Sequence, residues 1–258
     1  MLDKEALLNT RVYEQPYHKE KDYVQELFLG GIYDGFGGLV FKGGTALAKF
    51  YGSPRFSDDL DFALSEPGQS RSAASRIDRV ITSVSADYPV KVMRRGGHGS
   101  MLAYELSIRG PLFGATNKYQ HLRLEVDTGA GVVERTSTIR RNPVYQDLKP
   151  YMAVVLGERE ILAEKVVTLL FRQNPKARDL YDLYYMITQG TEVKTSLIDQ
   201  KMREYGHGFN DVDFGRRMGT IGRQWRKELE RLLPEDKFVD YEKARYPVAE
   251  AFRAAGLL

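Results

Sequence analysis

The sequence contains no cysteine among its 258 residues, and this absence excludes several kinds of site. Disulfide frameworks, cysteine-ligated zinc, iron–sulfur clusters and cysteine nucleophiles all require a thiol. Histidine is scarce as well, because the chain has only His18, His98, His121 and His207, which lack metal-ligand spacing. A bound metal would therefore be held by carboxylates, which favours a hard cation such as Mg²⁺.

Long hydrophobic runs are also missing. No apolar stretch approaches the roughly 20 residues that a membrane-spanning helix needs. The first five residues are largely charged, and no secretory signal follows them. We therefore expect a cytoplasmic protein with no membrane partner. The formal net charge of +3 permits nucleic-acid binding without indicating it.

The pattern of apolar residues predicts an α+β fold in two parts. Residues 1–155 mix helical and strand-like stretches, whereas residues 156–258 are almost wholly helical. We expect the first part to be the core and the second to complete its cleft. The expected helices of the core are 19–34, 45–51 and 71–85, and the expected strands are 39–41, 59–64, 90–93, 102–108, 121–127 and 151–156.

A glycine pair is the first feature with chemical content. The strand expected at 39–41 leads into Gly43 and Gly44 and then into a helix that Thr45 is placed to cap. Such a turn exposes backbone N–H groups beside the positive end of a helix, where a triphosphate can approach closely. A Gly-Gly pair by itself is more often only a turn, so its meaning depends on the residues that come after it.

A pair of carboxylates lies a short distance along the chain. In the strand expected at 59–64, Asp59 and Asp61 lie on one face and the large apolar residues on the other. Carboxylates at positions i and i+2 of a strand are close enough to share divalent ions. Nucleotidyl transfer needs such ions to activate the acceptor hydroxyl and to neutralise the triphosphate and the departing pyrophosphate. An Asp-x-Asp pair by itself is more often a solvated strand face.

Together these residues resemble a known family. Gly-Gly-Thr-x-Leu at 43–47, followed by Arg-x-Ser-x-Asp-Leu-Asp-Phe at 55–62, resembles the AbiEii-type nucleotidyltransferase toxins. That family includes the MenT-like toxins and belongs to the DNA polymerase β-like nucleotidyltransferase superfamily. The resemblance implies a mixed sheet flanked by helices. It also implies binding of Mg²⁺ or Mn²⁺ by Asp59 and Asp61, and of the triphosphate by Gly43, Gly44, Thr45 and Ser57.

A third carboxylate is expected on a neighbouring strand. In the strand expected at 121–127, apolar residues alternate with Arg123, Glu125 and Asp127. The superfamily often completes its metal site from such a strand, so the resemblance makes Glu125 or Asp127 a metal ligand. The alternative interpretation is a chance alternation on an exposed sheet face.

Two cations lie on an apolar stripe further along. In the helix that begins after residue 158, Lys165 and Arg172 share a face with leucine and isoleucine. A lysine at such a position must extend towards water or meet a negative partner. The segment 160–172 resembles a further family motif, which favours a nucleotide phosphate as that partner. A structural ion pair is the alternative.

The run at 177–184 resembles the fourth family motif. Asp179 and Asp182 are three residues apart on an expected helix and so share one side. The family carries a functional aspartate in this run, and we assign Asp179 rather than Asp182 to the catalytic site. Either aspartate could instead hold Lys165 or Arg172 in place.

The helical part also carries candidate RNA contacts. Trp225 and Tyr205 offer stacking surface for bases, and the pairs at 94–95 and 140–141 are arginines expected in loops. Charged helix faces are more often simply solvated. The basic residues of the helical part are Arg216, Arg217, Arg223, Arg226, Lys227 and Arg231.

The resemblance implies a function as well as a fold. It implies Mg²⁺-dependent transfer of a nucleoside monophosphate from a nucleoside triphosphate, in characterised relatives to the 3′ end of tRNA. It further implies the toxin role of a type IV-like (AbiE) toxin–antitoxin system, opposed by a cognate antitoxin. Two alternatives are a small-molecule acceptor, as in antibiotic-modifying relatives, and a non-catalytic nucleotide- or antitoxin-binding module. The presence of Asp59, Asp61 and Lys165 together argues against the non-catalytic module.

Overall fold

The computed structural model describes residues 2–35, 38–66, 68–129 and 131–258, and the chain divides into two compact units. Helix α3 (Gly43–Phe50) crosses from one unit to the other. In the described residues, no helix is both long and apolar enough to cross a membrane. Unit 1 consists of Met1–Ala46, Asp58–Val132 and Thr136–Val155, and unit 2 of Leu47–Ser57, Val133–Arg135 and Leu156–Leu258.

Unit 1 is built on a mixed seven-stranded sheet. Its strands are β1 (Leu39–Lys42), β2 (Leu60–Leu64), β3 (Val90–His98), β4 (Met101–Ile108), β5 (Gln120–Asp127), β6 (Ser137–Arg141) and β7 (Tyr151–Val155). They lie in the order β3-β4-β5-β2-β1-β7-β6. The pairs β1–β7 and β2–β5 are parallel, and the other neighbours are antiparallel. The predicted α+β fold with a mixed sheet and flanking helices is confirmed.

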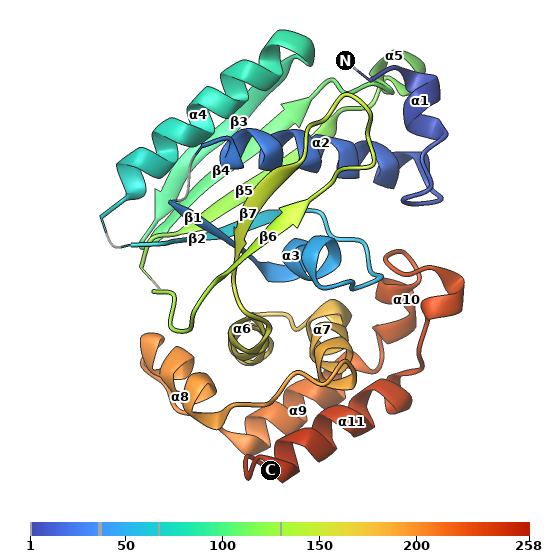
Figure 1. Cartoon of the computed structure of the whole chain (residues 1–258). Helices are drawn as coiled ribbons and strands as arrows, with labels where there is room; N and C mark the ends of the chain where they lie inside the picture. The colour runs from blue at the N-terminus through green and yellow to red at the C-terminus, as the bar shows by residue number, and fades with distance from the viewer. Residues whose placement is uncertain (1, 36–37, 67, 130) are drawn as a thin grey trace. The chain divides into compact units, whose positions relative to one another are not determined.

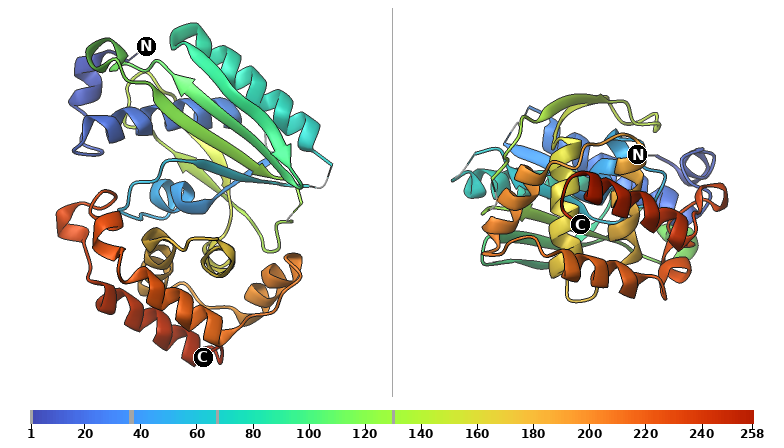
Figure 2. Two further views of the ribbon diagram at one scale, coloured as in Figure 1. Left: turned by 180° about the vertical axis from the view of Figure 1, so that it is seen from behind. Right: turned by 90° about the horizontal axis from the view of Figure 1, so that it is seen from below.

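Helices α2 (Pro16–Tyr33) and α4 (Ser70–Asp87) lie side by side on one face of this sheet (Figure 1). The view from behind shows both helices on the far side of the strands (Figure 2). Large side chains of the strands fill the space beneath them, and Phe41 and Phe62 meet with ring centroids 5.2 Å apart. Two short helices, α1 (Lys4–Leu8) and α5 (Phe113–Thr116), complete the unit.

Strand β6 was not predicted from the sequence. Its residues are polar and largely exposed, because β6 is an edge strand that pairs only with β7. Such a strand shows no apolar alternation, which is the signal that identified the other strands.

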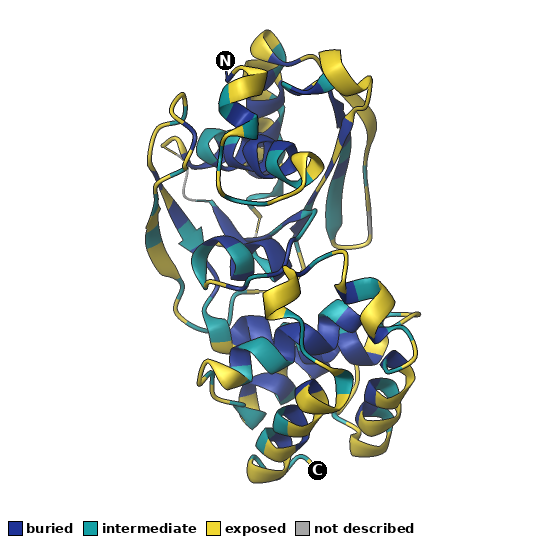
Figure 3. Ribbon diagram, turned by 90° about the vertical axis from the view of Figure 1, so that its right-hand side faces the viewer, coloured by how far each residue is buried: buried dark blue, intermediate teal, exposed yellow. Residues whose placement is uncertain are grey.

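Unit 2 is helical in its longest segment. Helices α6 (Glu158–Phe171) and α7 (Ala177–Thr188) pack on each other, and the later helices surround them. Helix α6 buries residues around its whole circumference, as expected of a central helix (Figure 3). The remaining helices are α8 (Thr195–Glu204), α9 (Asp211–Ile221), α10 (Trp225–Leu229), the 3₁₀ turn η1 (Glu235–Lys237) and α11 (Tyr241–Ala254).

Candidate active site

The strand register of unit 1 places three charged residues in one row. Asp61 of β2 is the partner of Lys42 on β1 and of Glu125 on β5. Residues paired in this way point to the same face of a sheet. Phe62 is buried on the opposite face, so this row lies on the face that α2 and α4 do not cover. The predicted metal ligands Asp61 and Glu125 therefore lie side by side.

The two candidates for the third carboxylate have different surroundings. Asp127 Oδ2 lies 3.6 Å from Lys42 Nζ, and Asp127 also accepts a hydrogen bond from the Gly129 N–H. Glu125 is paired on its own strand with Arg123, which is half exposed. Because Glu125 and not Asp127 is the register partner of Asp61, the geometry favours Glu125 as the companion of Asp61.

The donor set of this face fits a magnesium ion. Carboxylate oxygens are the ligands that Mg²⁺ prefers, and Mg²⁺ is usually bound by one or two carboxylates together with substrate phosphates. Within the described ranges, no three carboxylate, histidine or cysteine side chains are grouped so as to hold a metal ion together. Such a site would therefore take its remaining ligands from the triphosphate and water.

Gly43 is required where the chain leaves β1 and enters α3. Its φ of 77° lies in the left-handed region, and a Cβ at this position would collide with the carboxylate of Asp61. The backbone at the start of α3 therefore lies directly against the Asp61 carboxylate. This close approach joins the glycine pair and the Asp-x-Asp pair, which are separate features of the sequence.

We expect Gly43→Ala to damage both stability and activity. The positive φ alone costs a non-glycine residue about 1 kcal/mol, and relief of the collision would displace Asp61. The matched control is Gly68→Ala, because Gly68 also has a positive φ of 85° but nothing within 4 Å of its Cβ position. Thermal unfolding and nucleotide transfer should be measured on both variants. Equal activity losses in the two would contradict this role of Gly43.

Thr45 does not cap α3. The helix begins at Gly43, so Thr45 is already helical, and its buried hydroxyl donates a hydrogen bond to the Asp59 carbonyl. The capping prediction was therefore wrong, because the glycines themselves enter the helix. The hydroxyl instead ties α3 to the residue that precedes β2.

Helix α2 contacts Asp58, which lies directly before Asp59 and strand β2. Gln25 Nε2 donates to the Asp58 carbonyl over 3.0 Å, and Lys21 Nζ lies 4.0 Å from Asp58 Oδ1. Lys21 is buried, and burial lowers its pKa, while Asp58 and Asp59 act in the opposite direction. Neither side chain was predicted from the sequence as part of the site. The only available signal was that charged residues interrupt the apolar stripe of this helix.

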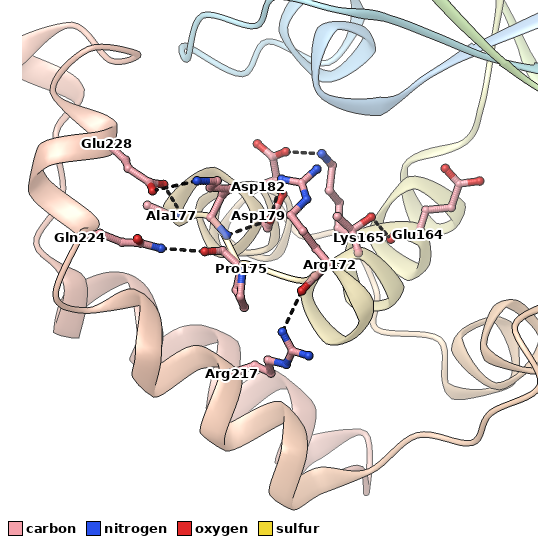
Figure 4. A network of polar contacts seen from close by, with 12 residues as sticks. Glu164, Lys165, Arg172, Pro175, Ala177, Asp179, Asp182, Arg217, Gln224 and Glu228 are labelled. Atoms are coloured by element: carbon pink, nitrogen blue, oxygen red, sulfur yellow. Dashed lines mark hydrogen bonds and ion pairs between the residues drawn. The ribbon is translucent and has the colours of Figure 1, made fainter. Parts of the chain in front are cut away.

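The predicted site residues Lys165, Arg172 and Asp179 belong to unit 2, where they form ion pairs (Figure 4). Asp182 is completely buried and accepts hydrogen bonds from Arg55 Nε at 2.5 Å and Nη2 at 2.7 Å. Lys165 Nζ lies 2.7 Å from the same carboxylate. Burial by itself would raise the pKa of Asp182, but Arg55 and Lys165 outweigh this effect and hold that pKa at about 2.

Asp179 also has a local role. It is buried, lies 3.0 Å from Arg172 Nη1, and accepts a hydrogen bond from the backbone N–H of Lys176 at the start of α7. Both aspartates thus hold a cation in place, which was the structural alternative for this motif. Ser57 ends the segment Leu47–Ser57 that belongs to unit 2.

The predicted RNA contacts require several corrections. Trp225 is buried and its indole N–H donates to the Val239 carbonyl, so its ring is not a stacking surface. Tyr205 is 55% exposed and stacks on Phe171. The arginine pairs at 94–95 and 140–141 lie in strands β3 and β6 rather than in loops. Strand β3 extends further through polar residues than the apolar pattern indicated, and the polar strand β6 was not predicted.

Comparison with known proteins gives a family and a fold. Residues 31–254 match the family model described as "Nucleotidyl transferase AbiEii toxin, Type IV TA system". A candidate nucleotidyltransferase from H. pylori matches with a TM-score of 0.59 at 17% identity, over 98% of this chain and 95% of that chain. The structure of JHP933 from Helicobacter pylori matches with a TM-score of 0.50 at 17% identity, over 98% and 93%. No curated protein matches.

Proposed function

Because the chain belongs to the AbiEii family of nucleotidyl transferase toxins, we propose that it transfers a nucleoside monophosphate to the 3′ end of tRNA in a Mg²⁺-dependent reaction. Membership itself makes the chain a nucleotidyltransferase of a type IV toxin–antitoxin system, with a nucleoside triphosphate as substrate and an antitoxin as partner. The Mg²⁺ dependence and the tRNA acceptor go beyond family membership and are our proposal.

One observation carries this proposal: the Asp61 carboxylate lies against the backbone of Gly43 and beside Glu125. Backbone N–H groups at the start of α3 can receive phosphate oxygens, since a helix N-terminus favours anions. Carboxylates at the same place can hold the cation that accompanies the triphosphate. Unit 1 therefore offers groups suited to both requirements of the proposed nucleotidyl transfer, which supports the proposal.

In the proposed reaction, Asp59 and Asp61 would hold the Mg²⁺, with Glu125 favoured over Asp127 as the third carboxylate. A metal ion at this position would polarise phosphate oxygens and lower the pKa of the acceptor hydroxyl. Gly43 and Gly44 orient the triphosphate through backbone N–H groups, with Thr45 keeping α3 fixed to Asp59. The acceptor oxygen forms a bond to the α-phosphorus, the bond from that phosphorus to the bridging oxygen breaks, and pyrophosphate leaves.

The predicted phosphate contacts of Lys165, Arg172 and Ser57, and the catalytic role of Asp179, stay predictions. Lys165 and Arg172 already have carboxylate partners in unit 2. We therefore assign Asp182 as the partner of Lys165 and Asp179 as the partner of Arg172. A direct part of Lys165 in the reaction requires a test of its own, with a variant that removes only the ammonium.

A labelling experiment tests the proposed reaction. The protein is incubated with total tRNA, Mg²⁺ and each α-³²P-labelled nucleoside triphosphate in turn, beside the double variant Asp59→Ala, Asp61→Ala. We expect label on tRNA with at least one nucleotide and none with the variant. Digestion of the product from its 3′ end should release the label first.

Two results would contradict the proposal. Label that resists chelation of divalent metal would remove the Mg²⁺ requirement. Absence of label on any RNA, with a folded protein and metal present, would remove tRNA as the acceptor. The small-molecule alternative would then be tested by the same assay with aminoglycosides in place of tRNA.

A further inference from the structure

A pocket of about 460 Å³ opens beside the C-terminal half of α7, within unit 2. Aromatic rings from Tyr181, Tyr184, Tyr185 and Phe238 line it, and polar side chains from α7 and α11 reach its edge. The volume lies within the range of small-molecule sites, which combine apolar walls with a few converging polar groups. None of the residues predicted from the sequence as catalytic or metal-binding lines this pocket.

The hydroxyl of Tyr181 is available to a ligand in this pocket. Tyr181 is only 3% exposed, yet its hydroxyl has no hydrogen-bond partner among the described residues. The neighbouring Tyr185 differs, because its hydroxyl donates to the Tyr51 carbonyl over 2.8 Å. In the described chain, the fully enclosed side-chain atoms without partners are Ser53 Oγ and Gln120 Oε1, so the Tyr181 hydroxyl keeps access to the pocket that it lines.

Three more polar groups at the pocket are available to a ligand. The Tyr184 hydroxyl, the Gln189 side-chain amide and the Lys243 ammonium likewise have no partner in the part of the chain that the structure describes. The remaining charges at the rim are already paired. Lys237 lies 3.0 Å from Asp236, and Asp240 lies 3.5 Å from Arg226.

These groups suit a nucleotide. Aromatic side chains stack on unpaired bases, and an amide and hydroxyls can read the hydrogen-bonding edges of a base. A single unpaired ammonium can hold one phosphate. We propose that this pocket binds one unpaired nucleotide of the acceptor RNA strand, an inference that rests on the proposed function for its source of RNA.

Binding of a labelled RNA tests the pocket directly, without nucleotide transfer. A fluorescein-labelled single-stranded RNA octamer is titrated with the full chain in the absence of nucleoside triphosphate, and anisotropy gives Kd. We expect Tyr184→Ala to weaken binding about tenfold. The control is Tyr246→Ala, since Tyr246 lies on α11 with Lys243, is 66% exposed and does not line the pocket. It should leave Kd unchanged.

Tyr181→Phe separates a binding role from a structural one. The variant removes only a hydroxyl that has no partner within the described residues of the free protein, so the unfolding temperature should be unchanged or raised. Binding should nevertheless weaken about threefold, as for the loss of one hydrogen bond. A lower unfolding temperature with unchanged Kd would overturn the proposal.

Two further experiments distinguish a nucleotide within an RNA strand from a free nucleotide. Abasic residues introduced at each position of the octamer should weaken binding strongly at one position only, and this effect should disappear in Tyr184→Ala. If free mononucleotides compete at the affinity of the octamer and no position stands out, the pocket binds free nucleotide and the strand proposal is wrong. If Tyr184→Ala prevents capture of an antitoxin but leaves RNA binding intact, the occupant is a protein and the proposal is also wrong.

Failure of the pocket and failure of the proposed function give different results. Label transfer to tRNA by the wild-type protein, with RNA binding unaffected by Tyr184→Ala and Tyr181→Phe, overturns only the pocket. Binding of RNA that depends on these two tyrosines, without transfer to any RNA, overturns only the proposed reaction.

Discussion

Replacing Asp61 with asparagine is expected to lower the rate of nucleotide transfer by at least about a thousandfold. The substitution removes one negative charge from the row formed with Lys42 and Glu125. In the proposed reaction, that charge would bind the cation that accompanies the triphosphate. The measurement is the initial rate of label transfer at saturating nucleotide, over a series of Mg²⁺ concentrations.

The fold should tolerate this change. Asp61 is not fully buried, and asparagine has nearly the same shape, so it can remain beside Gly43 without a collision. The unfolding temperature should therefore stay close to that of the wild type. Glu105→Gln is the matched control, because Glu105 is an exposed carboxylate on β4 that forms an ion pair with Arg94, outside the row. It should retain full activity.

The same assay distinguishes the two candidates for the third carboxylate. Since Glu125 is the register partner of Asp61 and Asp127 is engaged by Lys42, Glu125→Gln should raise the Mg²⁺ requirement more than Asp127→Asn does. The opposite order would assign the metal to Asp127. Retention of more than a tenth of the wild-type rate by Asp61→Asn would contradict the metal role of this row altogether.

The fold class could be predicted from the sequence because helices and strands are indicated by local patterns of apolar residues. Alternating apolar residues identified the strands that carry Asp61 and Glu125, and the period of two also placed both carboxylates on the polar face. That these two strands are parallel neighbours, with Asp61 beside Glu125, is a property of the sheet order. No local pattern contains that order, so the sequence left Glu125 and Asp127 equivalent.

The ion pairs of unit 2 were beyond sequence reasoning for a similar reason. Arg55 and Asp182 are separated by 127 residues, and each belongs to a different motif. Periodicity showed that Lys165 lies on an apolar stripe and needs a partner, but it could not choose between a phosphate and a carboxylate. Burial in three dimensions decided that Asp182 is that partner in the protein itself.

Asp182→Ala is expected to be the most destabilising substitution in unit 2. It leaves Arg55, which is 2% exposed, without the carboxylate that accepts two of its hydrogen bonds, and it also removes the partner of Lys165. Breaking a buried ion pair from one side costs about 3–5 kcal/mol, because the remaining charge stays buried. Urea unfolding of the full chain, followed by circular dichroism, measures the loss.

Asp179→Ala provides a graded comparison. Its partner Arg172 is about one-third exposed and so retains water when the carboxylate is removed. The variant also loses the hydrogen bond to the Lys176 N–H at the start of α7, which is worth about 1 kcal/mol. A larger loss of stability for Asp179→Ala than for Asp182→Ala would contradict the assignment of Asp182 as the central carboxylate.

The pH dependence of stability gives an independent check on Asp182. Its pKa of about 2 in the folded chain is below the value near 3.8 of a free aspartate. The unfolded chain therefore takes up this proton first as the pH falls. The contribution of Asp182, about 2 kcal/mol, is fully present above pH 4 and is lost between about pH 4 and pH 2. Asp182→Asn should show a shallower loss of stability than the wild type across this interval, and parallel curves would contradict the shifted pKa.

Lys165→Met completes the test, because it separates the ion pair from catalysis. Methionine keeps the length and apolar character of the lysine stem, and Asp182 keeps both hydrogen bonds from Arg55. The loss of stability should therefore be smaller than that of Asp182→Ala. If transfer activity falls only as far as the folded fraction falls, Lys165 acts through Asp182 alone. The Lys165 side chain is 13% exposed. A fully folded Lys165→Met protein whose rate drops a hundredfold or more would instead show that its ammonium acts on the nucleotide.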